Sequence, residues 1–152
     1  MSFQTGYLAD TQPVGAGEEH GNTNRVLGHR EFGNNLMCGR FARVDAVTGS
    51  LEALDGSATP VIAGVVLRRT STAVEAGGTI DATLTTGAIS YMQDGFVSVQ
   101  VKAGETPAYK GEVFASNDGD ADDGTAVTAG GVATGAVFIE EIRPDVWLID
   151  QK

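Results

Sequence analysis

Four carboxylate side chains gather in one short stretch of the chain. Asp118, Asp120 and Asp122 alternate, and Asp123 follows directly. Alternating aspartates open the EF-hand calcium loop, since hard cations are bound by several carboxylate oxygens. The sixth position of that loop is here Asp123 instead of glycine, and the twelfth is Ala129 instead of glutamate. These mismatches favour a solvated acidic loop over a looser Ca²⁺ site, and melting with and without millimolar Ca²⁺ distinguishes the two.

No other set of residues has the spacing of a reactive centre. His20 and His29 are the only histidines, and zinc needs three or four converging ligands. Glu140 and Glu141 are adjacent in a predicted strand, so they point to opposite faces and cannot act together as acid and base. Cys38 is the only cysteine, which excludes an internal disulfide and favours a small buried side chain. We therefore expect a protein that is not an enzyme and needs no metal and no cofactor.

The charge of the chain opposes nucleic acid and membranes as partners. The formal net charge is −10, whereas both partners require clustered basic side chains. No apolar run approaches the ~20 residues of a membrane span, so we expect a soluble protein made in a reducing cytoplasm. Residues 1–70 hold six arginines against seven carboxylates, and residues 71–152 hold four basic side chains against thirteen. The first half is thus the better candidate for meeting an acidic partner, although solubility alone also explains the charge.

The pattern of short apolar runs and turns predicts an all-β domain. Glycine is abundant, with 21 of 152 residues, and many turns between β-branched runs are typical of a sandwich or barrel. No helix of three turns is expected. The predicted strands are Leu36–Val44, Leu51–Leu54, Val61–Leu67, Ile80–Leu84, Ile89–Gln93, Phe96–Val101, Glu112–Ala115, Ala126–Thr128, Ala136–Ile142 and Val146–Ile149.

Three local features of these strands lead to specific expectations. Asp94-Gly95 lies between two β-rich runs, which predicts a two-residue hairpin with Met92 and Val97 on its apolar face. Gly39 interrupts the alternation of its strand and predicts a bulge. The continuously apolar run Val61–Leu67 predicts a strand that is covered on both faces.

The first 31 residues are polar and rich in glycine, and they predict no regular element. Such a segment cannot bury enough apolar surface to fold alone. It is either a disordered tail or an arm that becomes ordered against a partner or a neighbouring subunit. Its large apolar groups favour the arm, and they are Phe3, Tyr7, Leu8, Val26 and Leu27. We therefore divide the chain into an N-terminal arm, residues 1–31, and a single β-domain, residues 32–152.

A series of short motifs, in order along nearly the whole chain, resembles the cement or head-decoration proteins of tailed bacteriophages. Each motif is weak, and their order carries the resemblance. The motifs are Phe32-Gly33, Gly39–Asp45, Ala63–Arg68, Asp94-Gly95, Glu112–Phe114, Asp123–Thr125 and Gly135–Glu140.

The resemblance implies a compact jelly-roll-like or barrel domain with an extended arm. It also implies a protein of the virion that binds the outer capsid surface, with the major capsid protein and further copies of itself, as a dimer or trimer, as partners. Together with the charge distribution, it suggests a docking surface on the arm and the strands that follow it. The candidate docking residues are Phe3, Tyr7, Leu8, Arg25, Arg30, Arg40, Arg43, Arg68 and Arg69.

A carbohydrate- or receptor-binding module of a phage particle is the alternative function. Such a module would present exposed aromatic rings to its ligand. The candidates are Tyr91, Phe96, Tyr109 and Trp147, and Trp147 lies in an apolar terminal strand where a core position is favoured.

Overall fold

The computed structural model describes residues 16–20, 26–32, 36–67, 83–84 and 87–152. All regular structure in these residues is β-strand, which confirms the all-β prediction. None of them forms a helix long and apolar enough to cross a membrane. The strands are β1 (Val26–Phe32), β2 (Leu36–Met37), β3 (Phe41–Val44), β4 (Leu51–Ala53), β5 (Ile62–Val66), β6 (Thr83–Leu84), β7 (Gly87–Gln100), β8 (Glu112–Ala115), β9 (Ala126–Val127), β10 (Val132–Arg143) and β11 (Val146–Gln151).

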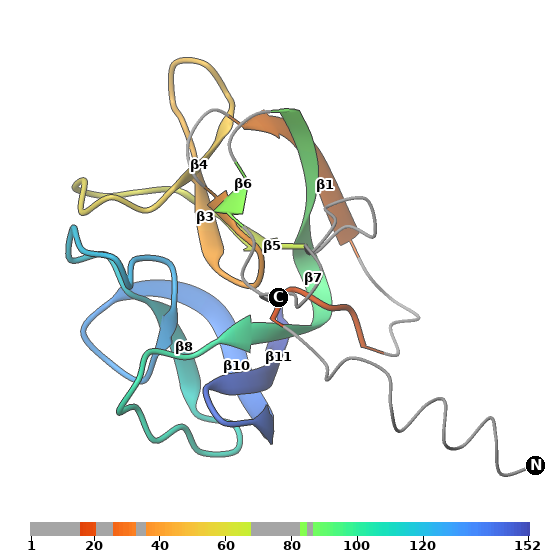
Figure 1. The fold of residues 1–152 in the computed structure, drawn as a ribbon, viewed down its shortest axis with the longest axis vertical. Helices are drawn as coiled ribbons and strands as arrows, with labels where there is room; N and C mark the ends of the chain where they lie inside the picture. The colour runs from red at the N-terminus through yellow and green to blue at the C-terminus, as the bar shows by residue number, and fades with distance from the viewer. Residues whose placement is uncertain (1–15, 21–25, 33–35, 68–82, 85–86) are drawn as a thin grey trace, which may run out of the picture.

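Nine of the strands form two rings that share the long strand β7. The hydrogen-bonded order is β1-β4-β3-β5-β7-β11-β10-β8-β9, and β1 also pairs with β7. This extra pairing closes β1, β4, β3, β5 and the first part of β7 into what we call the first ring. The rest of β7 continues through β11, β10, β8 and β9, and a parallel bridge from Ala126 to Val101 closes this second ring. Figure 1 shows β7 running from one ring into the other, as in a barrel-type architecture.

The predicted hairpin at Asp94-Gly95 is wrong, because β7 runs straight through these residues. Met92 pairs with Val65 of β5, and Val97 pairs with Ile149 of β11, so the partners come from other strands. Gly95 has φ 129°, and here the alternation of the side chains changes phase. Met92 and Val97 are an odd number of residues apart, yet both are fully buried in one core cluster. The sequence thus predicted the correct apolar face and the wrong pairing partner.

Two core clusters fill the molecule. The larger one lies mostly in the second ring and extends to β3 and β5, and the smaller one lies in the first ring. Val65 belongs to the larger cluster and Val66 to the smaller one, which confirms that the strand within 61–67 is covered on both faces. The largest fully buried side chains are Phe41, Phe138, Leu36, Leu51, Ile89, Met92 and Ile149.

The sequence predicted no regular element before residue 32, whereas residues 26–32 form β1. This strand pairs antiparallel with β7 over its whole length. The glycine that interrupts its pattern, Gly28, lies against the ring of Tyr91, and a Cβ there would be 2.1 Å from that ring. Residues 16–20 also add to β7, with Gly17 N–H donating to Ser98 O at 2.7 Å. Described parts of the predicted arm therefore belong to the sheet, and residues 1–15 and 21–25 lie outside the described residues.

The predicted bulge at Gly39 is a turn that separates β2 from β3. Gly39 has φ 80°, and a Cβ there would lie 2.1 Å from the methyl group of Ala16. Its N–H donates to Val66 O at 2.8 Å, so the turn is fixed to β5. A positive φ and a close neighbour both require glycine here. Of the predicted strand at Ile80–Leu84, only β6 is described, and it pairs with β2.

Candidate functional site

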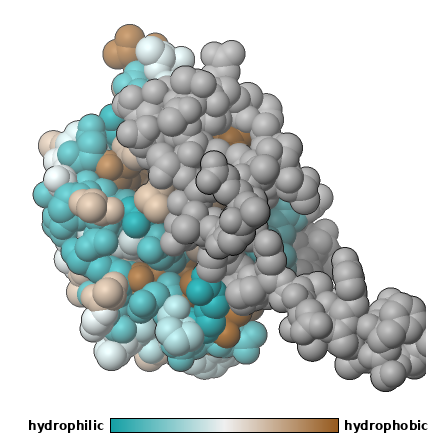
Figure 2. All heavy atoms as spheres, in the orientation of Figure 1, coloured by the Kyte–Doolittle hydropathy of each residue, from teal (hydrophilic) through white to brown (hydrophobic). Residues whose placement is uncertain are grey.

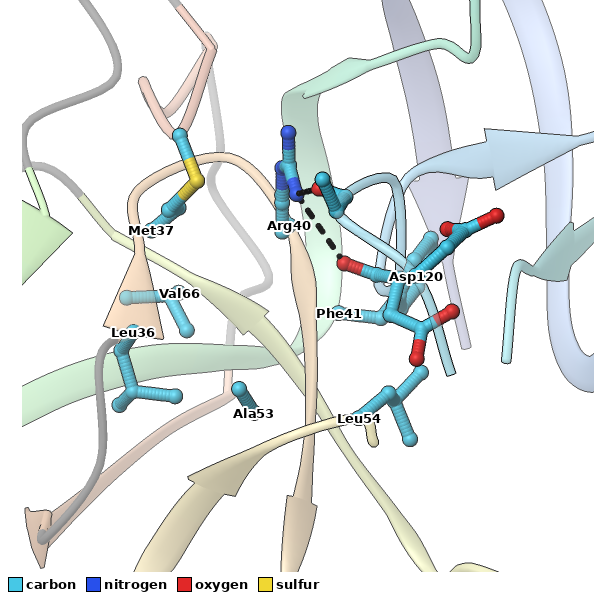
Figure 3. Close-up of a pocket in the computed structure, with 10 residues that line it drawn as sticks. Leu36, Met37, Arg40, Phe41, Ala53, Leu54, Val66 and Asp120 are labelled. Atoms are coloured by element: carbon cyan, nitrogen blue, oxygen red, sulfur yellow. Dashed lines mark hydrogen bonds between the residues drawn. The ribbon is translucent and has the colours of Figure 1, made fainter. Parts of the chain in front are cut away.

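A cleft of about 150 Å³ opens where the first ring meets the acidic loop between β8 and β9. Figure 3 shows Leu36, Met37 and Val66 on one side of Arg40 and Asp120 on the other. The lining residues are Leu36, Met37, Arg40, Phe41, Ala53, Leu54, Val66, Asp120, Ala121 and Asp123.

Arg40 ties three parts of the chain together at this cleft. Its Nε donates to Gln100 Oε1 at the end of β7, at 2.8 Å. Its Nη1 donates to the backbone oxygens of Ala121 at 2.6 Å and Asp123 at 3.3 Å. Hydrogen bonds from a charged donor are roughly twice as strong as neutral ones. A side chain predicted to meet a partner is therefore engaged inside its own chain.

The acidic loop is organised by its own groups. Asp123 is only 7% exposed, and its carboxylate accepts from the backbone N–H of Asp118 at 2.7 Å and of Gly119 at 2.9 Å. Lys102 Nζ lies 3.5 Å from Asp118 Oδ2 and 3.9 Å from Asp120 Oδ2. Within the described residues, no group of three or more His, Cys, Asp or Glu side chains is arranged to hold a metal ion. The loop is thus held by its own hydrogen bonds and by Lys102.

Arg43 also makes its contacts within the first ring. Its Nη2 lies 2.6 Å from Glu52 Oε2 and 3.3 Å from Asp55 Oδ2, and its Nε donates to Ala53 O at 3.2 Å. The half-buried guanidinium thus links β3 to β4. Whether it also contacts a partner stays a prediction.

Arg30 of β1 holds the turn between β3 and β4. Its Nη1 donates to Gly49 O at 2.7 Å, and its Nε donates to the Tyr91 hydroxyl at 3.0 Å. The other candidate docking residues lie outside the described residues, and their role as partner contacts stays a prediction. They are Phe3, Tyr7, Leu8, Arg25, Arg68 and Arg69.

The turn between β3 and β4, residues 45–49, is built around the carboxylate of Asp45. Asp45 Oδ1 accepts from the backbone N–H groups of Val47 and Thr48, both at 2.8 Å, and from the Thr48 hydroxyl at 3.1 Å. The N–H of Gly49 donates to Asp45 O at 2.9 Å. The backbone bond from Thr48, then that from Val47, lowers the pKa of Asp45 from its ordinary 3.8.

This shift predicts an acid-induced loosening of the turn. Because the pKa of Asp45 is lower in the folded protein than the ordinary 3.8, its stabilising effect is fully present above pH 3.8 and is lost as the pH falls through the folded-state pKa. In an NMR pH titration, we expect the amide signals of Val47 and Thr48 to move with one shared midpoint below 3.8. Asp45→Ala should abolish this titration. A shared midpoint at or above 3.8 would contradict the prediction.

Sequence reasoning missed the most exposed large apolar side chain of the described residues. Val47 is 92% exposed at the tip of this turn. Its signal was present in the sequence, since Thr48-Gly49 is typical of a turn and a β-branched residue directly before it is unusual. Of the aromatic rings proposed for a glycan, Tyr91 is only 2% exposed and Tyr109 is 67% exposed. Trp147 packs edge-on against Phe138, with ring centroids 5.7 Å apart.

Comparison with known families matches the model of the XM1 gp53 minor capsid protein to residues 14–149. The chain belongs to this minor capsid protein family. A chain in the solved capsid of Myoviridae phage XM1 has the same fold, with a TM-score of 0.80 at 30% sequence identity. The similarity covers 99% of this chain and 97% of that chain. A comparison with curated proteins finds no significant match.

Membership of the minor capsid family confirms the resemblance to phage head proteins and gives the chain a structural role in a virion. The match begins at residue 14 and so includes described segments that the sequence had assigned to the arm, namely residues 16–20 and β1. These segments pair with β7 in the sheet. The family match and the sheet thus both extend into the segment that the sequence assigned to the arm.

Proposed function

We propose that this chain is a non-enzymatic cement protein of a phage head. It binds the outer surface of the capsid as a dimer or trimer and links neighbouring major capsid subunits. The observation that carries the proposal is the match of residues 14–149 to a minor capsid family, together with the fold shared with a capsid chain.

The physical basis of cementing is multivalent attachment. Each copy needs only modest contacts with the capsid. Once one copy of an oligomer has bound a capsid subunit, the other copies are held at high local concentration near their own binding sites. Binding to the assembled shell and not to the separated subunits stabilises the shell by mass action. The internal engagement of Arg40 and of the Asp123 carboxylate supports a structural role over a catalytic one.

We place the arm contact of this proposal in residues 1–15, with Phe3, Tyr7 and Leu8 as apolar anchors. The arginines Arg25, Arg68 and Arg69 are proposed to meet acidic groups of the capsid. The described arginines Arg30 and Arg40 hold the fold on which such contacts depend.

The proposal predicts that the purified protein co-sediments with expanded capsids of its own phage and raises their melting temperature. Light scattering on the free protein should give the mass of a dimer or trimer. Capsids that have not expanded serve as the control. Absence of sedimentation with its own expanded shells would overturn the proposal, and a stable monomer would remove its multivalent basis.

Removal of residues 1–15 tests the arm. We expect the shortened protein to melt at an unchanged temperature and to bind capsids at least about tenfold more weakly, since linked contacts multiply in affinity. Removal of residues 1–31 is the matched control, because it also deletes all of β1 except Phe32 and should unfold the first ring. Full capsid binding by the protein without residues 1–15 would show that these residues do not contact the capsid.

A further inference from the structure

The acidic loop between β8 and β9, residues 116–124, contacts the first ring as well as the second ring that carries it. It faces the loop between β4 and β5, residues 54–61, on the side of the molecule away from the crossing of β7 (Figure 1). Figure 2 shows a mostly hydrophilic surface on that side. The two rings are thus connected twice, through the shared strand β7 and through polar contacts of this loop.

Asn117 makes the central contact between the two loops. Its Oδ1 accepts from the backbone N–H of Gly56 at 2.8 Å, and its Nδ2 donates to Ser57 O at 2.9 Å. A single side-chain amide therefore pairs with one backbone donor and one backbone acceptor, as a neighbouring strand would do.

Glycines let the acidic loop approach the first ring closely. A Cβ at Gly56 would lie 2.9 Å from the backbone of Gly119, and a Cβ at Gly124 would lie 2.7 Å from Phe41 O. Gly56 has φ 82° and Gly124 has φ 86°, and both angles favour glycine. The N–H of Phe41 in β3 donates to Gly124 O at 2.8 Å. Both ends of the acidic loop are therefore bonded to the first ring.

Arg40 adds a third attachment in the middle of the acidic loop. Its Nη1 donates to Ala121 O at 2.6 Å and to Asp123 O at 3.3 Å. The loop is thus attached to the first ring along its length and not at a single point.

Strand β7, the other connection, has a glycine at the place where the rings meet. Gly95 has φ 129°, and a glycine inside a strand often marks a bend. The partner of β7 changes here from β5 to β11. A connection through this strand alone would allow the rings to turn about Gly95, whereas a second connection on the opposite side opposes that motion.

We propose that the acidic loop is a joint that fixes the angle between the two rings. Such a joint belongs to the free protein and stands independently of the proposed capsid binding. A fixed angle would allow surfaces on both rings to meet one partner together, because order that exists before binding lowers the entropy lost on association.

Distances between spin labels on the two rings test the joint. Val47→Cys in the first ring and Tyr109→Cys in the second provide label sites, because the native side chains are 92% and 67% exposed. The loop that carries Tyr109 is bonded to β10, since the N–H of Lys110 donates to Phe138 O at 2.7 Å. Cys38 is buried, and buried thiols are inert to such reagents.

Pulsed electron paramagnetic resonance of the doubly labelled protein should give one narrow distance distribution. Asn117→Ala removes both bonds to the loop of the first ring and should broaden the distribution at least about twofold, since the remaining hinge can then move. Gly56→Ala should have the same effect, because its Cβ separates the loops. Gly130→Ala is the matched control, since Gly130 has φ 79° but a Cβ there meets no atom within 4 Å.

Three results would overturn the joint. The first is an unchanged distribution in both Asn117→Ala and Gly56→Ala. The second is equal broadening in Gly130→Ala, because the effect would then come from backbone strain and not from the loop contact. The third is equal broadening between labels that are both in the second ring, at Tyr109→Cys and at the exposed Glu140→Cys of β10, because that ring itself would then have loosened.

Discussion

Gly64→Ala is expected to remove a large part of the free energy of unfolding. Gly64 has φ 151°, which alanine rarely adopts, and a Cβ there would lie 2.0 Å from the backbone oxygen of Met92. That oxygen is part of β7, so relief of the clash requires β5 and β7 to separate. Overpacking and a strained backbone together cost about 4 kcal/mol, against a total stability of roughly 5–15 kcal/mol for most domains.

Gly104→Ala is the matched control for this prediction. Gly104 has φ 88°, but a Cβ at this position meets no atom within 4 Å. Its substitution should cost only about 1 kcal/mol, from the backbone angle alone. Urea unfolding of both variants measures the difference. Equal losses of stability would show that the close approach of β5 to β7 is not as described.

Arg40→Ala is expected to lower the free energy of unfolding by about 2–3 kcal/mol. The substitution removes hydrogen bonds from a charged donor and leaves the acceptors of these bonds without that donor. The acceptors are on β7 and on the acidic loop, at Gln100, Ala121 and Asp123. For a chain of this length, the loss corresponds to a fall in melting temperature of roughly 5–10 °C. Differential scanning calorimetry provides the measurement.

Arg40→Lys controls for the charge of this side chain. An ammonium keeps the charge, but it cannot donate in the planar fork that reaches both Gln100 and the loop carbonyls. We therefore expect most of the loss to remain in the lysine variant. A melting temperature like that of the wild type in Arg40→Ala would return this arginine to the candidates for partner binding.

The strands of the second half could be predicted from sequence because their signals are local. The strand starting at Glu112 and the last strand, β11, begin where apolar alternation begins, next to recognisable turns. Strand β7 was misinterpreted because Asp94-Gly95 is typical of a hairpin, whereas a single strand that changes partners there has no local signature. The apolar face was still correct, since burial determines side-chain pattern whichever strand is the neighbour.

The arm and the arginines were harder to predict because their partners are distant in sequence. Gly28 resembles a strand breaker until the ring of Tyr91, more than sixty residues away, is placed against it. Arg40 can donate to the carbonyl of Ala121 only because the turn between β2 and β3 lies beside the acidic loop between β8 and β9. Charge counts could identify the basic region of the chain, but they could not distinguish arginines that serve the fold from those available to a partner.

The sharing of β7 by both rings has a consequence for how this protein can be taken apart or re-engineered. Neither ring has a closing strand of its own, because each is completed by a different part of β7. The halves are therefore not exchangeable modules, and a cut at Gly95 should not yield two fragments that fold independently. Foreign sequence is better inserted at an exposed loop such as the one around Gly130, where a Cβ meets nothing within 4 Å.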